Sequence, residues 1–564
     1  MDRNTLTAIL LSTVVVILFY TFFLPKPQPP EPTSDPGVVT TTGEAQRTED
    51  PSPSAGGPAL GQAPGGTEYE EPGEAVETRD APAGASGLDR AASESPVVVE
   101  TEFYRAEFTN RGGVIRSWEL KSYDNPFGDP VQLVFAGNTE LGLVLESPMG
   151  DLDLSNTLFE SRLEGLPDGG RRLTFTAGDG PRSVEKVFEL PPGGYLTRLD
   201  IRLSGFPDVT GYRIGWRGGI PRAEKNPRQD DSSMGAIVLL GDSKETLKPD
   251  KFKKEAIRPL DGNVRWAGVR NKYFMAVVVP PEDISSRALA FGDNETKRVG
   301  AEVILPIRQG SAAHSFQVYL GPMNYKRLKD IGFGLDKSVD LGWKVFRPLS
   351  QLLLTSMLWL YSFIPNYGVV IIIISLLTKV IFYPLTKSSL KSMRAMQRLQ
   401  PEMTALREKF KGDNQRLQAE MMGLYKKHKV NPVGGCLPIV VQMPVFFALY
   451  SVLSNSIVMR NAGFVGWIND LSSPDTIAIV GGFAIHVIPI ILFGFTVLQQ
   501  LLTPSGDPRQ KMMGYMMPFV TLFIFYQFPA GLNLYWTVNS IMTVAQQWVI
   551  HREDPGTAPA ASTA

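Results

Sequence analysis

Lys379 lies inside the apolar run IIIISLLTKVIFYPL, which extends from Ile371 to Leu385. The lysine is about eleven residues into a segment of membrane-spanning length, roughly 16 Å deep at 1.5 Å per residue. A charge at the centre of a bilayer costs about 2.5–3.5 kcal/mol on insertion scales. The amine therefore needs water, a partner, or a route along its own stem to the membrane surface.

Neither an ion pair nor the lysine stem alone accounts for this charge. The nearer end of the segment is about 10 Å away and a lysine stem covers about 6 Å, so snorkelling is strained. The other apolar segments contain no Asp or Glu, and the nearest acids, Asp470, Asp475, Asp507 and Glu553, flank them. We therefore expect water to solvate Lys379, within a cavity shaped by polar groups.

Polar and amphipathic side chains in the apolar segments are candidates for lining that cavity. Ser375 lies four residues before Lys379 and shares its helical face. The other candidates are Gln442, Gln499, Gln500, Asn533, Tyr535, Trp536 and Asn539. Hydrogen bonding between helices is the alternative role for each of them. Together they predict a hydrophilic recess in the inner half of the bilayer that attracts acidic or polar peptide segments.

The sequence contains no pattern that predicts catalysis. Cys436 is the one cysteine, which excludes an intramolecular disulfide, and the four histidines are spread over the whole chain. We find no nucleophile–base set, phosphate-binding loop or metal cluster. We therefore expect no enzyme activity, no catalytic residue, no cofactor, no metal and no specific nucleic-acid site.

The elements that must position these residues divide the 564-residue chain into several parts. Residues 1–24 contain the apolar run Thr5–Leu24, long enough to form a transmembrane anchor. A cleaved signal peptide is the alternative, although no A-x-A-like site follows. Residues 25–96 are rich in Pro, Gly, Ala, Ser and Glu, which predicts a disordered acidic linker.

The rest of the chain changes from a strand pattern to a helix pattern. Residues 97–323 alternate with a period near two between Gly, Pro and Asp turns, which predicts a large β-sandwich. Residues 324–364 turn helical, and 346–364 is amphipathic and aromatic, which favours an interfacial helix over a membrane span. Residues 365–552 hold five apolar segments, and 553–564 form a short tail. The five predicted spans are Tyr367–Thr386, Leu437–Ser454, a segment within Thr476–Leu502 that starts near His486, Met513–Phe528 and Leu532–Ile550.

The distribution of Lys and Arg predicts a single orientation. The loop 387–435 is strongly basic and should be cytoplasmic, as should the loop that carries Arg509 and Lys511. The loop 457–475 has Arg460 as its one basic residue and should lie outside. The β domain then also lies outside, and both termini lie inside.

The basic loop 387–435 has its own helical pattern. Apolar residues recur at three and four positions on both sides of the break at KGDN, which predicts a hairpin of two antiparallel amphipathic helices. Its methionines could form an adaptable docking face or could simply pack the hairpin together. Lys391, Arg394 and Arg398 are the candidates for contact with anionic lipid and acidic ribosomal surface.

Four segments of the chain carry a resemblance to a known family. They are GVVIIIISLLTKVIFYPLTKSSLKSMRAMQRLQPEM, LYKKHKVNPVGGCLPIVVQMPVFFALY, WINDLSSPD and FPAGLNLYWTVNSIMTVAQQ, and they closely resemble the YidC family of membrane-protein insertases. The motif FTNRGGVIRSWEL, nearer the N-terminus, is similar to the Gram-negative form of this family. The resemblance implies a multi-domain protein of the bacterial inner membrane. Its α-helical membrane core would comprise an N-terminal anchor plus five spans, with a large all-β periplasmic β-supersandwich of the galactose-mutarotase-like type.

The resemblance also implies a function. Family members insert small membrane proteins alone and assist the Sec translocon with larger ones, through a hydrophilic groove open to cytoplasm and lipid. Ser375, Gln499 or Gln500, and Trp536 match groove-lining positions. Lys379 takes the place of an arginine, which keeps the charge but loses the guanidinium fork. The expected partners are nascent membrane proteins, the ribosome, the Sec translocon and anionic lipids.

The short tail HREDPGTAPAASTA departs from relatives that end in a long basic tail. Contact with the ribosome should therefore depend on the loops 387–435 and 503–512. A secondary transporter that binds an anionic solute at Lys379 is the alternative function, although the chain shows neither an internal repeat nor an acid for proton coupling. A periplasmic binding or scaffolding protein would need only one anchor and would leave the lysine unexplained.

Overall fold

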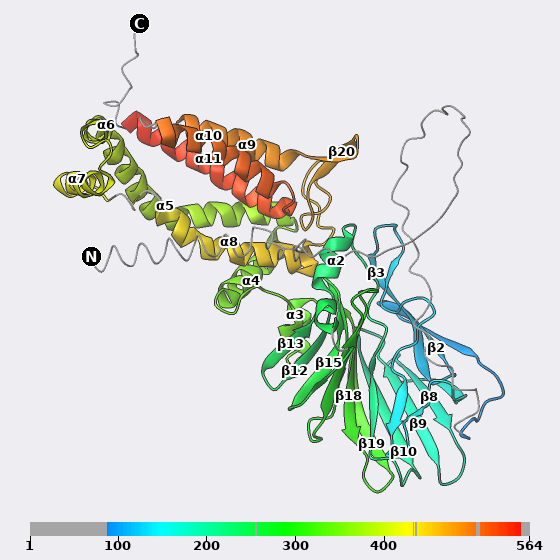
Figure 1. The fold of residues 1–564 in the computed structure, drawn as a ribbon. Helices are drawn as coiled ribbons and strands as arrows, with labels where there is room; N and C mark the ends of the chain where they lie inside the picture. Colours follow the sequence, from blue (N-terminus) through cyan, green and yellow to red (C-terminus); the bar gives the residue numbers. More distant parts are fainter. Residues whose placement is uncertain (1–86, 254–255, 432–433, 435–436, 503–507, 554–564) are drawn as a thin grey trace, which may run out of the picture. The chain divides into compact units, whose positions relative to one another are not determined.

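The computed structural model describes residues 87–253, 256–431, 434, 437–502 and 508–553. The predicted anchor at 1–24, most of the predicted linker at 25–96 and nearly all of the predicted tail at 553–564 lie outside these residues. Along the described chain, β-sheets precede a group of long helices (Figure 1).

The described strands between Pro96 and Pro322 form three antiparallel sheets. The first sheet consists of β1 (Pro96–Glu100), β2 (Tyr104–Thr109), β3 (Val114–Asp124) and β4 (Pro130–Gln132). The second has the order β13 (Ser243–Leu247), β12 (Gly235–Leu240), β15 (Val264–Arg270), β16 (Phe274–Val279), β19 (Ala312–Pro322), β10 (Leu196–Ser204), β9 (Ser183–Leu190), β8 (Arg171–Ala177) and β7 (Glu160–Gly165). The third has the order β14 (Ile257–Leu260), β17 (Arg287–Gly292), β18 (Val299–Pro306), β11 (Gly211–Trp216), β5 (Leu143–Glu146) and β6 (Leu152–Asp153).

The alternating sequence pattern explains why these strands pack as a sandwich. In β10, Leu199, Ile201 and Leu203 are buried, whereas Arg198 and Arg202 between them are exposed. Strand β16 is buried at every position, as expected for a strand covered on both faces. The second and third sheets pack against each other through β12, β15 and β18. The predicted β domain is therefore present as packed sheets.

This domain begins before residue 97, where the linker was predicted to end. Leu88 is buried, and its carbonyl accepts a hydrogen bond from the Gly178 amide at 2.7 Å. The Asn110 side chain accepts a hydrogen bond from the Ser95 amide at 2.6 Å. These contacts tie the last residues of the predicted linker to the sheets, a result that its polar composition did not indicate.

The described helices comprise short ones, most of them in or next to the β domain, and longer ones that follow the β domain in the chain. The short elements are α2 (Pro227–Ser233), η1 (Pro249–Phe252), α3 (Tyr325–Ile331), η2 (Leu335–Ser338) and η4 (Ile457–Met459). The long helices are α4 (Arg347–Phe363), α5 (Tyr367–Arg398), α6 (Gln400–Lys409), α7 (Asn414–Lys427), α8 (Leu437–Asn455), α9 (Val487–Leu501), α10 (Pro508–Phe525) and α11 (Ala530–Glu553). Of the described helices, α5 alone is both long and apolar enough to cross a membrane by length and composition.

Helix α5 extends beyond the span that was predicted for it, whereas the start of α9 agrees with its prediction. Helix α5 does not end near Thr386 but continues as one helix to Arg398, so Lys391 and Arg394 extend the spanning helix rather than open the hairpin. The segment before α9 is a β-hairpin of β20 (Thr476–Val480) and β21 (Phe483–His486). The start of α9 at Val487 agrees with the predicted start near His486.

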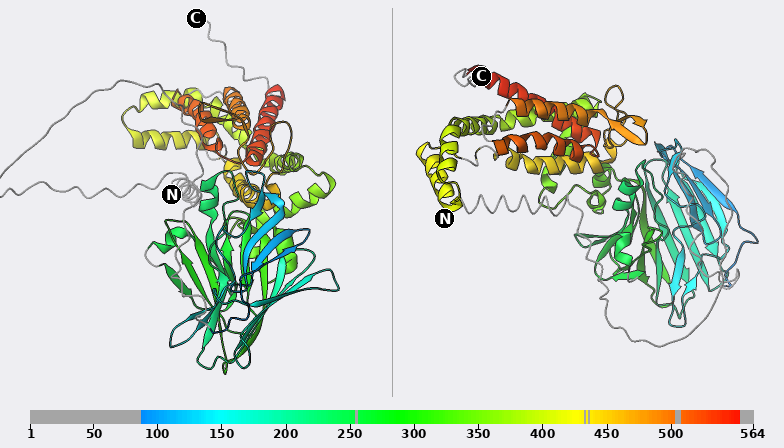
Figure 2. Two further views of the ribbon diagram at one scale, coloured as in Figure 1. Left: turned by 90° about the vertical axis from the view of Figure 1, so that its right-hand side faces the viewer. Right: turned by 45° about the horizontal axis from the view of Figure 1, so that its top comes forward.

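Helices α6 and α7 form the predicted antiparallel pair next to the end of α5 (Figure 2). Met403 is buried between them, and its sulfur accepts a hydrogen bond from the Tyr425 hydroxyl at 3.7 Å. Met422, in contrast, is 44% exposed. The methionines thus divide between packing the hairpin and facing outward.

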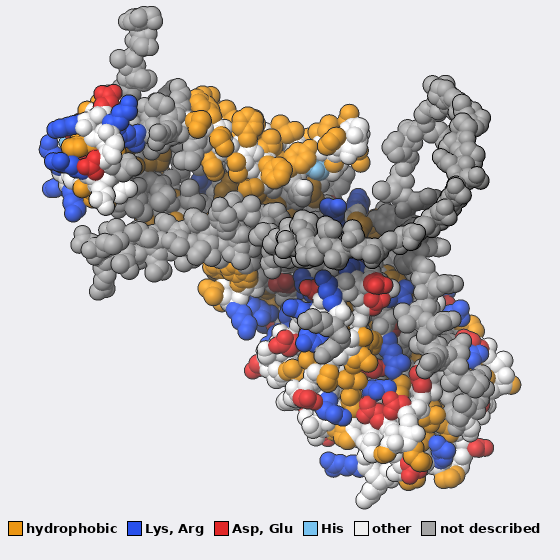
Figure 3. Space-filling view, in the orientation of Figure 1, with side chains coloured by type: hydrophobic (Ala, Val, Ile, Leu, Met, Phe, Trp, Pro, Cys, Tyr) orange, Lys and Arg blue, Asp and Glu red, His pale blue; other side chains and the backbone are white. Residues whose placement is uncertain are grey.

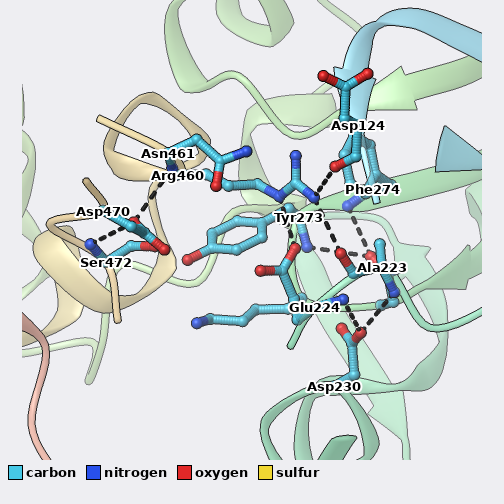
Figure 4. Close-up of polar contacts among 12 residues, drawn as sticks. Asp124, Ala223, Glu224, Asp230, Tyr273, Phe274, Arg460, Asn461, Asp470 and Ser472 are labelled. Atoms are coloured by element: carbon cyan, nitrogen blue, oxygen red, sulfur yellow. Dashed lines mark hydrogen bonds and ion pairs between the residues drawn. The ribbon is translucent and has the colours of Figure 1, made fainter. Parts of the chain in front are cut away.

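The loop after α8 contacts the β domain through polar groups. Arg460 donates to the backbone carbonyls of Asp124 at 2.7 Å and Ala223 at 3.0 Å (Figure 4). The Tyr273 hydroxyl donates to the Ser454 carbonyl at 3.1 Å. The predicted outside loop and the β domain therefore lie at the same end of the helices.

Candidate functional site

Helix α5 carries both Lys379 and Ser375 and is fixed at its start by a side-chain cap. The Asn366 side chain accepts a hydrogen bond from the Val369 amide at 3.1 Å. Ser375 is fully buried and its hydroxyl donates to the Ile371 carbonyl at 2.7 Å. That hydroxyl therefore serves the helix backbone, which leaves Lys379 as the polar group that projects from α5 at this depth.

Lys379 has a neutral partner on α11. Its Nζ donates to Thr543 Oγ1 at 2.7 Å, and the Thr543 hydroxyl donates in turn to the Asn539 carbonyl at 2.7 Å. The amine is thus held by an uncharged hydroxyl, in agreement with the absence of acidic residues from the apolar segments. The sequence interpretation missed Thr543, although its spacing of four residues from Asn539 places both on one face of α11.

A second polar contact links α8 to α11, eight residues before Thr543 along α11. Gln442 Nε2 donates to the Tyr535 hydroxyl at 3.1 Å, and Tyr535 is fully buried. Trp536 packs its ring against Phe446 and Phe525, with centroids 5.3 and 5.4 Å apart. Trp536 therefore belongs to an aromatic cluster, and it lies on α11, the helix whose Thr543 holds Lys379.

Gln499 and Gln500 lie near the end of α9, which packs against both α10 and α11. The Gln500 amide lies directly against Gly514 of α10, where a β-carbon would collide with it. This contact serves the packing of α9 on α10. The predicted groove residues thus fall into two groups: Lys379, Gln442 and Tyr535 are joined through α11, whereas Gln500 faces α10.

Helix α11 also buries oxygen atoms that have no hydrogen-bond partner within the described part of the chain. These atoms are Asn533 Oδ1, Thr537 Oγ1, Asn539 Oδ1 and Gln546 Oε1. A buried oxygen without a partner is unfavourable by about 1–3 kcal/mol unless water or another donor reaches it. Asn539 and Gln546 lie within about one helical turn of Thr543, so their oxygens need a donor from water or from another molecule close to the Lys379 contact.

The predicted docking residues lie at the other end of α5. Lys391 and Arg398 are exposed and Arg394 is half-buried. Arg509 and Lys511 fall in the first turn of α10, and their side chains lie outside the described part of the structure. Within the described ranges, no three His, Cys, Asp or Glu side chains gather to hold a metal.

Comparison with known proteins places this arrangement in a family. Residues 96–355 match the family model described as the YidC periplasmic domain, and residues 359–557 match the 60Kd inner membrane protein model. The chain is 33% identical to the "Membrane protein insertase YidC" of Syntrophus aciditrophicus, covering 98% of this chain and 100% of that protein. The chain belongs to the YidC family. The insertase of the same name from Geotalea daltonii is 36% identical, over 81% of this chain and 87% of that protein.

Among solved structures, an active YidC insertase with its first transmembrane domain resolved is 19% identical, with a TM-score of 0.37. The match covers 82% of this chain and 94% of the chain in that structure. A galactose mutarotase-like protein from Lactobacillus casei is 9% identical over 40% of this chain and 100% of that chain, with a TM-score of 0.29. The mutarotase-like type of the β domain stays a prediction at these scores.

The family assignment predicted from the sequence motifs is thereby confirmed. This YidC-family chain is an inner-membrane protein with a periplasmic domain composed mostly of β-sheets, followed by a helical region. The number of spans, the placement of the termini and the groove roles of individual residues stay predictions.

Proposed function

We propose that this protein inserts and helps fold inner-membrane proteins, alone or with the Sec translocon, through a hydrophilic groove open to cytoplasm and lipid. The observation that carries the proposal is the contact between Lys379 and Thr543, which holds a cation inside the helical region on a neutral hydroxyl. The names of the curated relatives support it, since they are called membrane protein insertases.

The groove acts by shortening the dry path that a client segment must cross. Water around Lys379 and the partnerless oxygens of α11 would extend the aqueous phase to about the bilayer midplane, which halves the hydrocarbon thickness of about 30 Å. The positive charge of Lys379 attracts the acidic or polar outer segment of a client. The client's apolar segment then moves into lipid, which supplies the driving force.

The interaction must also be weak enough for the client to leave. A neutral hydroxyl partner meets this requirement because it orients the amine without neutralising it. An Asp or Glu at the position of Thr543 would instead pair with Lys379 and compete with an acidic client.

The experiment compares two clients that differ only in acidic residues of the outer segment, in cells that carry a variant at Lys379. Lys379→Arg keeps the charge and should insert both. Lys379→Ala should insert the acidic client poorly and the neutral one nearly normally, and Lys379→Glu should affect the acidic client most. Protease protection of the outer segment is the measurement.

Two results decide against the proposal. If Lys379→Ala inserts both clients at the wild-type rate, the lysine is not part of a client-binding groove. If vesicles containing the purified protein take up an anionic solute in a Lys379-dependent manner, the transporter alternative replaces the insertase proposal. Equal abundance of all variants in the membrane is the control.

The proposed docking partners follow from charge. Lys391, Arg394 and Arg398 lie along the cytoplasmic extension of α5 and would contact anionic lipid and the ribosome. The exposed lysines of α7 add to the same basic region. We assign delivery of nascent membrane proteins to this surface.

A further inference from the structure

The hairpin formed by β20 and β21 exposes apolar side chains that no other described part of the chain covers. Ile477 is 52% exposed, Ile479 72%, Val480 62% and Phe483 80%. The residues of the hairpin, TIAIVGGFAIH, include no Asp, Glu, Lys or Arg. An apolar surface of this kind in a folded protein marks a contact with lipid or with another protein.

The hairpin is a defined element rather than a loose loop. Val480 pairs with Phe483 across Gly481 and Gly482, whose φ angles of 56° and 83° are those of a tight two-residue turn. The two ends of the hairpin are held together at its base. The carboxylate of Asp475, just before β20, accepts hydrogen bonds from the amides of Val487 and Ile488, just after β21, at 2.9 and 2.8 Å. The direction in which the tip projects is therefore set by the start of α9.

Tyr526, the residue directly after α10, holds the second strand. The Tyr526 hydroxyl donates to the Ala484 carbonyl at 2.6 Å, and the His486 ring packs on Tyr526 with centroids 4.6 Å apart. These contacts place the hairpin against the end of α10. Figure 3 shows the hydrophobic surface of α9 and α10 continuing onto the hairpin.

The length of α9 explains why such an extension is needed. Its fifteen residues rise about 22 Å, which is less than the roughly 30 Å of a bilayer's hydrocarbon core. Strands of four and five residues rising about 3.3 Å each extend the apolar surface from the start of α9 toward the interface. The hairpin thus continues the lipid-facing surface of α9, which includes Ile490 and Ile491 at 48% and 41% exposure.

We propose that the hairpin lies in the lipid interface on the β-domain side of the membrane, with its four exposed apolar side chains at the acyl boundary. The open backbone edge of a two-stranded hairpin needs water, so the hairpin lies in the interface and not in the hydrocarbon centre. The occupant of this surface is lipid. A second copy paired edge to edge, or a client strand added to the hairpin, would be a different occupant.

The experiment uses the full chain in lipid nanodiscs, with Cys436 replaced by Ser and one fluorescent label on an introduced cysteine. The test position is Ile479→Cys. Phe523→Cys, 83% exposed on α10, is the lipid-facing reference, and Met149→Cys, 86% exposed between β5 and β6, is the aqueous reference. Quenching is measured with lipid that carries a nitroxide near the headgroup and, separately, with iodide in solution.

Label at position 479 should be quenched by the nitroxide lipid several-fold more than label at position 149, and by iodide several-fold less. Equal behaviour at 479 and 149 would overturn the proposal. Oxidative cross-linking of Ile479→Cys into dimers at the expense of lipid quenching would overturn it in favour of a second copy. Protection from iodide only when a client is bound would overturn it in favour of a client strand. Quenching measured without a client does not depend on insertion activity, so the lipid proposal can fail while the proposed function still holds.

Discussion

Arg460 Nε lies 2.7 Å from Glu224 Oε1, joining residues that are 236 positions apart in the chain. Both side chains are largely buried, at 5% and 13% exposure. The guanidinium also lies over the Phe274 ring, 5.4 Å from its centroid. Burial raises the pKa of Glu224 to about 7, although Arg460 acts to lower it. One arginine thus connects the loop after α8 to the β domain.

Replacement of Arg460 should loosen this loop. Arg460→Ala leaves Glu224 buried without its partner, and breaking a buried pair typically costs about 3–5 kcal/mol. Hydrogen–deuterium exchange in the segment 456–475 of the full chain should become markedly faster. Because the abandoned Glu224 can take up a proton, the effect should be smaller at pH 5 than at pH 8.

Arg222→Ala is the matched control for this prediction. Arg222 pairs with Asp231 at 2.8 Å on the surface, where both side chains are partly exposed. An exposed pair contributes about 0–1 kcal/mol, so exchange in 456–475 should not change. Identical exchange in the two variants would show that the Arg460 contacts do not hold the loop.

The stability of the β domain should fall with rising pH because of Glu140. Its carboxylate accepts the Gly218 amide at 2.7 Å, and burial raises its pKa to about 8 from 4.5. Between these values the folded state holds a proton that the unfolded state releases. The free energy of unfolding should therefore decrease by about 1.4 kcal/mol per pH unit in that window. The free energy of unfolding, measured with denaturant, should fall more steeply with pH in the wild type than in Glu140→Gln. Parallel pH curves for the two proteins would contradict the prediction.

Lys186 should produce the opposite trend at higher pH. Its Nζ donates to the Leu141 carbonyl at 2.8 Å, and burial lowers its pKa to about 7 from 10.5. Between these values the unfolded state holds the extra proton, so stability should rise with pH. Lys186→Met should remove this rise above pH 8 and leave the falling limb of Glu140 intact. A rise that persists in Lys186→Met would assign it to another group.

Loss of the Thr543 hydroxyl should impair insertion without removing the charge. Thr543→Val deletes the partner of Lys379, and hydrogen bonds to charged groups contribute about 1.5–3 kcal/mol. Insertion of an acidic client should fall to a level between those of wild type and Lys379→Ala, measured by protease protection. Thr496→Val on α9 is the control, because the Thr496 hydroxyl donates to the Phe493 carbonyl of its own helix at 2.8 Å. Equal effects of the two valine variants would argue against a positioning role for Thr543.

Charge reversal on the part of α5 that follows Pro384 should weaken docking. Changing Lys391, Arg394 and Arg398 to Glu alters the charge by about six units, and each base near an anionic surface contributes about 1 kcal/mol. We expect poorer insertion and less ribosome recovered with membrane vesicles, at normal protein abundance. The same reversal at Lys426, Lys427 and Lys429, at the end of α7, tests whether position matters as well as charge. Unchanged insertion of every client by the α5 variant would remove these residues from the docking surface.

The sequence predicted best where a residue was physically out of place. Lys379 was recognisable because a charge in an apolar run requires compensation, and the structure supplies it through Thr543. Thr543 itself was not recognisable, since a threonine in an apolar helix usually bonds only to its own backbone. Arg460 indicated orientation through the scarcity of other bases around it. Its contact with Glu224 depends on tertiary packing, to which no local pattern points.

Element boundaries were harder to predict than element types. The predicted span ended near Thr386, because about 20 residues suffice to cross a bilayer. A helix need not stop at the membrane surface, however, and α5 continues to Arg398. The β20–β21 hairpin was not predicted, because the predicted span started near His486 and the residues before it were given no structure of their own. The Gly481–Gly482 pair between Val480 and Phe483 was the available signal for a tight turn.

Pro384 lies inside α5, five residues after Lys379 and seven before Lys391. Proline lacks the amide hydrogen that would bond to the carbonyl of Val380, so the helix is mechanically weakest there. Pro384 divides α5 into a fixed arm, which contacts α11, and a second arm, which leads to the α6–α7 pair. Bending at Pro384 would swing the basic residues through a wide arc while Lys379, on the fixed arm, keeps its place beside α11.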